Sequence, residues 1–179
     1  MKSMLGNDFD FVVQGKGIVF ANLFAYKVNG SFFVLDEERD TARAVFKAGV
    51  GSQESGVKKI QADFSGVRGS IDEDLRSRDF TINSMAIPLD ERLVVSGQWS
   101  EASLIDPTGG RRDIDERVLR ATSPNVLKED PLRIMRAYRF SSSLDFAIDE
   151  GLSNQIKKHC EDLNRVSEER VRAELFMIL

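Results

Sequence analysis

Short runs in which apolar and polar residues alternate fill the chain up to about Thr122, and Gly and Asp residues separate them. Such alternation is typical of strands that bury one face. We expect strands at residues 8–13, 31–36, 42–49, 57–66, 92–95 and 104–106. Segment 17–28 instead places apolar residues near helical spacing, which predicts a helix that lies on the sheet.

The pattern becomes helical after Pro124. Helices are expected at residues 124–143, 149–163 and 167–179. The last of them begins with Ser167 as a capping residue, followed by two glutamates that suit a helix N-terminus.

This change of pattern predicts an α+β fold in two parts. We expect a strand-rich domain at residues 1–122 and an all-helical region at 123–179. The last predicted helix is still strongly apolar at Leu179, so we expect this sequence to be the front part of a longer chain.

Composition restricts the class of protein. Of the 179 residues, 41% are hydrophobic and 30% are charged, as in ordinary globular proteins. We find no targeting segment and no apolar run near the roughly 18 residues that a membrane span needs. We therefore expect no membrane partner. The single cysteine, Cys160, cannot form an internal disulfide, so a location in the reducing cytoplasm is expected.

The charged residues are unevenly distributed. The formal net charge of -4 argues against indiscriminate binding of polyanions. The arginines nevertheless gather between Arg111 and Arg139, and again at Arg165, Arg170 and Arg172, which allows a localised basic surface.

Two carboxylates stand one residue apart in the first predicted strand. Residues two apart on a strand point to the same face, so Asp8 and Asp10 share one side. Like charges held this close repel each other unless a divalent cation lies between them, and oxygen ligands suit Mg²⁺. Asp63, in the middle of another predicted strand, is a candidate third acid. The alternative is an exposed strand end with solvated acids.

A second group of candidate residues occupies 76–87, with the sequence "RSRDFTINSMAI". If 81–87 is helical, Arg78 and Asp79 lie at its N-terminal entry, where free N–H groups favour phosphate. Asn83 is an amide among apolar residues and invites a polar partner. The alternative is an amphipathic helix with exposed arginines.

A third group lies in "KEDPLRIMRAYRF", where Asp130 suits a helix cap and Pro131 suits the first helical position. Glu129, Asp130, Arg133 and Arg136 then fall on one side of the helix. Glu129 and Arg133 could form only an ion pair. A carboxylate beside a guanidinium also matches the hydrogen-bonding edge of cytosine or adenine and repels that of uracil or guanine.

Four motifs together resemble one family. "DFDF", "RSRDFTINSMAI", "LIDPTGGRRDIDERVLR" and "KEDPLRIMRAYRF" follow in the order and spacing of the bacterial tRNA nucleotidyltransferase and poly(A) polymerase family, the class II CCA-adding type. The likeness runs from about Leu5 to the end of the chain. It implies a nucleotidyltransferase head of the polymerase-beta type, with a mixed sheet and flanking helices, at 1–122 and a helical neck at 123–179.

The resemblance also implies metal-dependent chemistry. Asp8 and Asp10 match the family's catalytic, metal-binding Asp-x-Asp pair, and Asp63 lies where a third acid is often found. Two Mg²⁺ ions are expected to position an RNA 3′-hydroxyl and the α-phosphate of the incoming nucleotide.

The nucleotide site implied by the resemblance has one part for the sugar and phosphates and one for the base. The implied residues are Arg78, Asp79 and Asn83 for the former, Asp130 and Arg133 for the base edge, and Glu129 and Arg136 as their support.

Three departures from the family pattern bear on function, and one is that the family's body and tail regions, which grip tRNA, do not follow the neck in this sequence. The family's Gly-Gly turn, which precedes the acid pair and cradles the triphosphate, is not in this sequence, which begins "MKSMLG". We therefore expect either a chain started late or a fragmentary copy. The family's loop between "DFSGVR" and "SIDEDLRSRDF", tied to addition of the terminal A, is very short. This favours the CC-adding subtype slightly.

The expected function is template-independent addition of C or A, from CTP or ATP, to the 3′ end of tRNA, with release of pyrophosphate. The alternatives within the family are complete CCA addition, A addition and poly(A) addition. A different alternative is a catalytically inactive RNA-binding fragment.

Overall fold

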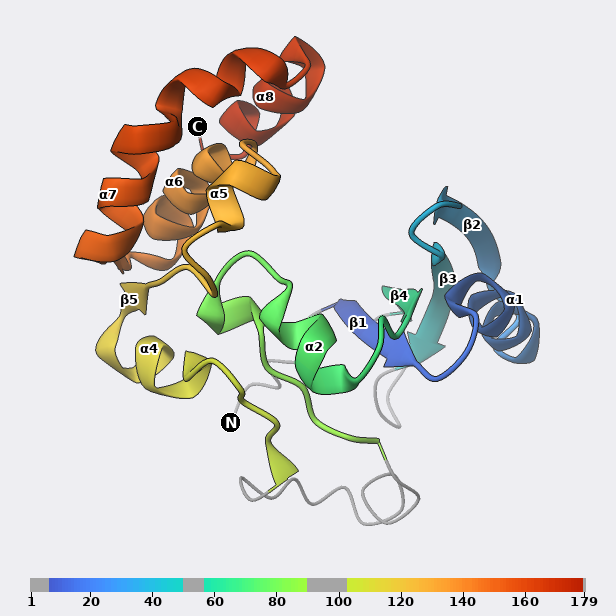
Figure 1. Cartoon of the computed structure of the whole chain (residues 1–179). Coiled ribbons are helices and arrows are strands. Elements are labelled where there is room, and N and C mark those ends of the chain that lie inside the picture. Colours follow the sequence, from blue (N-terminus) through green and yellow to red (C-terminus); the bar gives the residue numbers. More distant parts are fainter. Residues whose placement is uncertain (1–6, 50–56, 90–102, 179) are drawn as a thin grey trace. The chain divides into compact units, whose positions relative to one another are not determined.

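The computed structural model describes residues 7–49, 57–89 and 103–178. Contacts divide the chain after Gly69 into two compact units, which are described separately. Figure 1 shows the strands of the sheet in the first unit and the helices that dominate the second.

The first unit is built on a four-stranded mixed sheet. Strand β1 pairs in parallel with β4, whereas β4 with β3 and β3 with β2 are antiparallel. In spatial order the strands are β1 (Asp8–Val13), β4 (Val57–Gly66), β3 (Thr41–Gly49) and β2 (Ser31–Asp36). The mixed sheet is confirmed, and the strands lie within one residue of the predicted bounds.

Helix α1 (Gly17–Lys27) packs on one face of this sheet, as predicted. Alanines on the helix and strands bring the two close, and Phe64 fills the centre of the core, with its ring centroid 5.1 Å from that of Phe24. The buried core residues are Ala21, Ala25, Ala42, Ala44, Ala62 and Phe64. We call the face turned away from α1 the open face; in the described part of this unit, α1 is the only helix.

The start of α1 is fixed from the β2–β3 turn. The carboxylate of Asp40 accepts hydrogen bonds from the N–H groups of Gly17 and Ile18, at 2.7 and 3.2 Å. A Cβ at Gly17 would lie 2.5 Å from the Asp40 carbonyl oxygen, so this approach requires glycine.

The second unit is mainly helical. Its elements are α2 (Ile71–Arg76), η1 (Thr81–Asn83), α4 (Gly110–Glu116), β5 (Val118–Leu119), α5 (Val126–Glu129), α6 (Arg133–Leu144), β6 (Ala147–Ile148), α7 (Glu150–His159), η3 (Cys160–Arg165) and α8 (Glu168–Phe176). In the described residues no helix is long and apolar enough to cross a membrane.

The second unit has one hydrophobic core, to which residues on both sides of the predicted boundary at 122 contribute. Phe80, which precedes that position, is fully buried with residues of α5, α6 and α7. The core residues are Phe80, Leu119, Val126, Leu127, Ile134, Ala137, Leu152 and Ile156. Packing therefore divides the chain after Gly69, and the domain boundary at 122 stays a prediction.

Two predicted elements differ in the structure, and a third lies outside the described residues. The helix considered at 81–87 is only the short 3-10 helix η1, because Ala86 pairs with Ile105 in an isolated bridge. That single bridge also replaces the strand expected at 104–106. The strand expected at 92–95 lies outside the described residues.

The helical region is also more divided than predicted. The helix expected at 124–143 is split into α5 and α6, because Asp130 is extended and Pro131 offers no N–H to continue the first helix. The two-residue strand β6 pairs in parallel with β5, so the region after 122 is not all helical. Ser167 takes the N-cap position of α8 as expected, but its side chain makes no capping hydrogen bond.

Candidate active site

The acid pair lies on the open face of the sheet. Asp8 and Asp10 are exposed, whereas Phe11 of the same strand packs against the core beneath α1. The register pairs Asp10 with Asp63 on β4 and places Arg43 of β3 next to Asp63. The predicted alternation of β1 is thus confirmed, and three carboxylates share one face.

Arg43 dominates the hydrogen bonding on this face. It donates from Nε and Nη2 to the two oxygens of Asp63, at 2.7 and 2.8 Å, and from Nη1 to Gln61 at 2.8 Å. Gln61 in turn donates to Asp8 at 2.7 Å. The hydrogen bond to Asp63 raises the pKa of the Arg43 guanidinium despite desolvation, and the charges of Asp63, Asp8 and Asp10 add to this effect.

Asp8 and Asp10 fit a divalent cation better than Asp63 does. Within the described residues no side chain hydrogen-bonds to Asp10, and Asp8 has one oxygen left after its bond to Gln61. Both oxygens of Asp63 are held by Arg43. In the described part of the chain no group of three or more His, Cys, Asp or Glu residues is arranged to hold a metal. The expected third ligand, Asp63, is therefore engaged by Arg43 in this structure.

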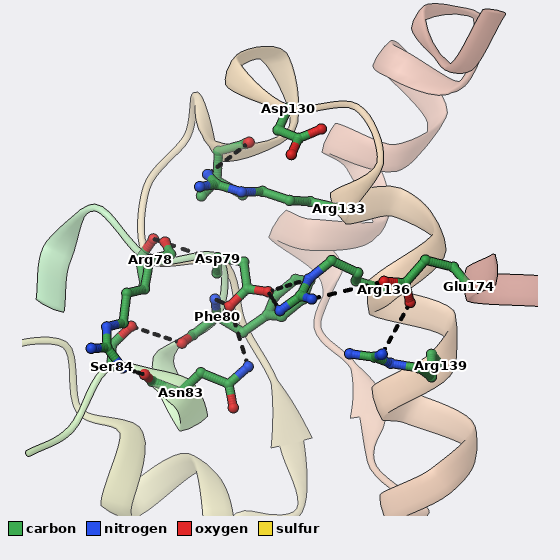
Figure 2. Close-up of polar contacts among 12 residues, drawn as sticks. Arg78, Asp79, Phe80, Asn83, Ser84, Asp130, Arg133, Arg136, Arg139 and Glu174 are labelled. Atoms are coloured by element: carbon green, nitrogen blue, oxygen red, sulfur yellow. Dashed lines mark hydrogen bonds and ion pairs between the residues drawn. The ribbon is translucent and has the colours of Figure 1, made fainter. Parts of the chain in front are cut away.

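The segment expected to hold sugar and phosphates is fixed against residues 120–122. Phe80 pairs with Ala121 in an isolated bridge, and the Thr81 hydroxyl donates to the fully buried Asp113 at 2.7 Å. Arg78 donates to the carbonyl of Asn83 at 3.1 Å (Figure 2). These contacts, rather than a regular helix, position the segment, so the expected helix N-terminus for phosphate is absent.

Asp79 is the centre of this segment. Its side chain is only 7% exposed, and one oxygen accepts hydrogen bonds from the Phe80 N–H and the Asn83 amide, at 2.9 and 3.2 Å. The other oxygen lies 2.8 and 2.6 Å from Nε and Nη2 of Arg136 (Figure 2). Asp79, Asn83 and Arg136 are thus brought together, although the resemblance had placed Arg136 with the base-reading pair.

Helix α8 completes this network. Glu174 is buried and forms ion pairs with Arg136 at 3.8 Å and with Arg139 at 3.2 Å. Both guanidinium groups also lie over the Phe140 ring, 5.4 and 4.6 Å from its centroid. A buried acid between two arginines therefore ties α8 to α6.

Asp130 and Arg133 lie at the start of α6 (Figure 2). Asp130 accepts from the Leu132 N–H at 3.1 Å, so it caps the turn that leads into the helix, and its second oxygen lies 3.2 Å from Arg170 of α8.

The guanidinium of Arg133 is held by its neighbours. It donates to the carbonyls of Val126 and Ser77, at 3.2 and 3.3 Å, and Nη1 lies 3.4 Å from Glu129. The ion pair between Glu129 and Arg133, which the sequence allowed as an alternative, is present.

The sequence patterns did not single out three residues that organise the site: Arg43, Gln61 and Glu174. Arg170 was noted only as part of an arginine cluster, and its contact with Asp130 was not predicted. The alternation of β3 places Arg43 on its polar side, but its partner follows only from strand register. Glu174 is a charged residue on the packed side of α8, which helical spacing could have flagged.

Two family models match the chain. The poly(A) polymerase head domain matches residues 1–120, and the probable RNA- and SrmB-binding site of polymerase A matches residues 145–179.

Curated relatives and solved structures agree with these matches. A CC-adding tRNA nucleotidyltransferase of Geobacter sulfurreducens is 41% identical over 97% of this chain and 36% of its own length. An A-adding tRNA nucleotidyltransferase of Deinococcus radiodurans is 35% identical over 89% and 33%, respectively. The structure of the Thermotoga maritima CCA-adding enzyme complexed with tRNA is 32% identical, with a TM-score of 0.76 over 98% of this chain and 39% of that one.

The chain thus spans about a third of the length of the relatives that it matches. Its head-domain match, its similarity to these relatives and the shared fold lead to one conclusion: the chain belongs to the tRNA nucleotidyltransferase and poly(A) polymerase family.

Proposed function

We propose that this chain carries the nucleotide-transfer and base-reading parts of an enzyme that adds C or A, from CTP or ATP, to the 3′ end of tRNA. The observation that carries the proposal is the pair of exposed carboxylates, Asp8 and Asp10, side by side on the open face of a family head domain.

Asp8 and Asp10 are the proposed ligands of two Mg²⁺ ions. Bound Mg²⁺ would activate the RNA 3′-hydroxyl and offset the charge of the departing pyrophosphate. The protein's own part is to hold the two carboxylates on a rigid strand. Gln61 fixes one oxygen of Asp8, and Arg43 keeps Asp63 paired, which reduces the negative charge beside the metal ligands.

Arg78, Asp79 and Asn83 are the proposed contacts to the sugar and phosphates of the nucleotide. Asp79 is buried and fully engaged with Asn83 and Arg136, so its proposed part is to position its neighbours. Arg78 is partly exposed; besides its bond to the Asn83 carbonyl it pairs with Asp74 at 3.4 Å, and its five N–H groups leave donors for a phosphate.

Asp130 and Arg133 are the proposed reader of the base edge. Contacts with Glu129, Val126 and Ser77 fix the plane of the Arg133 guanidinium before a base arrives. An oriented donor beside the Asp130 acceptor favours cytosine and adenine over uracil and guanine. Pre-orientation lowers the entropy lost on binding.

Within the family we favour CC addition. Only residues 67–70 separate β4 from α2, which leaves no room for the family's longer loop tied to adding the terminal A. A addition is the second candidate, because the chain is also similar to the A-adding relative named above.

The test is incorporation of single labelled nucleotides into tRNA that ends before CCA, in the presence of Mg²⁺. Incorporation from CTP but not from ATP supports CC addition. Incorporation from ATP alone supports the A-adding alternative and contradicts our subtype. If no nucleotide is incorporated, even when the family's Gly-Gly turn is fused in front of Met1, the enzyme proposal fails and an inactive RNA-binding fragment remains.

A further inference from the structure

A pair of lysines faces each other on the open face, beside the acid pair. The register of β3 and β4 places Lys47 directly opposite Lys59, and both side chains are exposed. Lys59, Gln61 and Asp63 alternate along β4 and therefore point to the same face. The lysine pair thus lies two residues, or about 7 Å, beyond the row that contains Gln61 and Asp8.

The register places two like charges opposite each other. Residues directly opposite in an antiparallel pair have Cβ atoms roughly 5 Å apart, and like charges there repel. Among the described residues neither lysine forms an ion pair: Asp63 is held by Arg43, and Asp8 by Gln61. An anion between the two ammonium groups would relieve the repulsion.

We propose that Lys47 and Lys59 bind backbone phosphates of the RNA strand whose 3′ end is extended. This inference rests on the proposed function, because it takes the metal ligands Asp8 and Asp10 as the position of the RNA 3′-hydroxyl. An RNA strand ending there has further phosphates upstream, and the lysine row offers positive charge on the same face. The incoming nucleotide has its own proposed contacts at Arg78 and Asn83.

The chain provides a matched control. Lys58 is the neighbour of Lys59 on β4 and is also exposed, but the alternation of the strand points it to the α1 side of the sheet. Lys58→Ala therefore removes the same charge from the same strand without changing the open face.

The experiment measures binding of fluorescent tRNA that ends before CCA to the 179-residue chain, by anisotropy at several salt concentrations. The Lys47→Ala/Lys59→Ala variant should weaken RNA binding at least several-fold. Each lost phosphate contact reduces the salt slope by roughly 0.7–0.9, so the double variant should lose about 1.4–1.8. Lys47→Arg/Lys59→Arg should retain both affinity and slope, and CTP binding should be unchanged in every variant.

Three results would overturn the inference: equal losses in the double variant and Lys58→Ala, a loss of CTP binding instead of RNA binding, or no measurable RNA binding by the unaltered chain. Because the assay requires no turnover, it separates this inference from the proposed function. A chain that adds no nucleotide can still show the selective loss of RNA binding, and an active chain can fail to show it.

Discussion

Hydrogen-bond partners on the open face determine which aspartate is free to bind a metal ion. Asp10 has a free carboxylate among the described residues, whereas Asp63, which pairs with it in register, is bound by Arg43 through both oxygens. An acid held in this way is a poor additional metal ligand unless Arg43 moves. The two residues are of the same type, so their different availability for a metal ion follows from the register of the sheet, which places Arg43 next to Asp63.

The base-reading proposal is tested at Asp130. We expect Asp130→Ala to weaken discrimination against UTP, because the variant loses the acceptor that repels the uracil edge, while its Mg²⁺ dependence stays nearly unchanged. The measurement is the ratio of kcat/KM for CTP and UTP. Asp115→Ala, which removes an exposed acid from α4, is the control. An unchanged CTP preference in Asp130→Ala would refute the reading role.

At the scale of elements, strands were easier to predict than helices. The bounds of β1 and β4 agree with the alternation of the sequence, because a two-residue period with one buried face determines a strand. The bounds of β2 also agree, although its apolar residues are consecutive and Phe33, Val34 and Leu35 are exposed. Segment 81–87 has the apolar spacing of a helix, but the bridge between Ala86 and Ile105 draws it into an extended path. A contact this distant in sequence leaves no local pattern.

Helix α6 is tied to segment 76–87 by the ion pair between the buried Asp79 and the partly exposed Arg136. We expect Asp79→Ala to lower the free energy of unfolding by about 1.5–3 kcal/mol, the range for hydrogen bonds to charged groups. In the half-exposed pair Asp72–Arg76, the control Asp72→Ala should cost less than about 1 kcal/mol. Urea unfolding measures both losses of free energy. Equal losses in the two variants would contradict the conclusion that Asp79 anchors α6.

At the scale of the whole molecule, two cores support two sets of candidate residues. The acid pair lies in the first unit, and the residues proposed to bind the nucleotide and to read its base lie in the second. The sequence identified the acid pair and the motif residues through spacing and family resemblance. It could not identify the partners that hold them, because Asp79 and Arg136 are 57 positions apart and Arg43 meets Asp63 only through strand pairing.

The central claim is that Asp8 and Asp10 support metal-dependent nucleotide transfer. Its most direct test is incorporation of labelled CTP into tRNA lacking CCA by the unaltered chain and by Asp10→Ala, with and without Mg²⁺. Asp10 is exposed, so the variant should fold, and Glu38→Ala removes another exposed acid as a control. We predict Mg²⁺-dependent transfer by the unaltered chain and Glu38→Ala and none by Asp10→Ala. Retained transfer by Asp10→Ala would contradict the account.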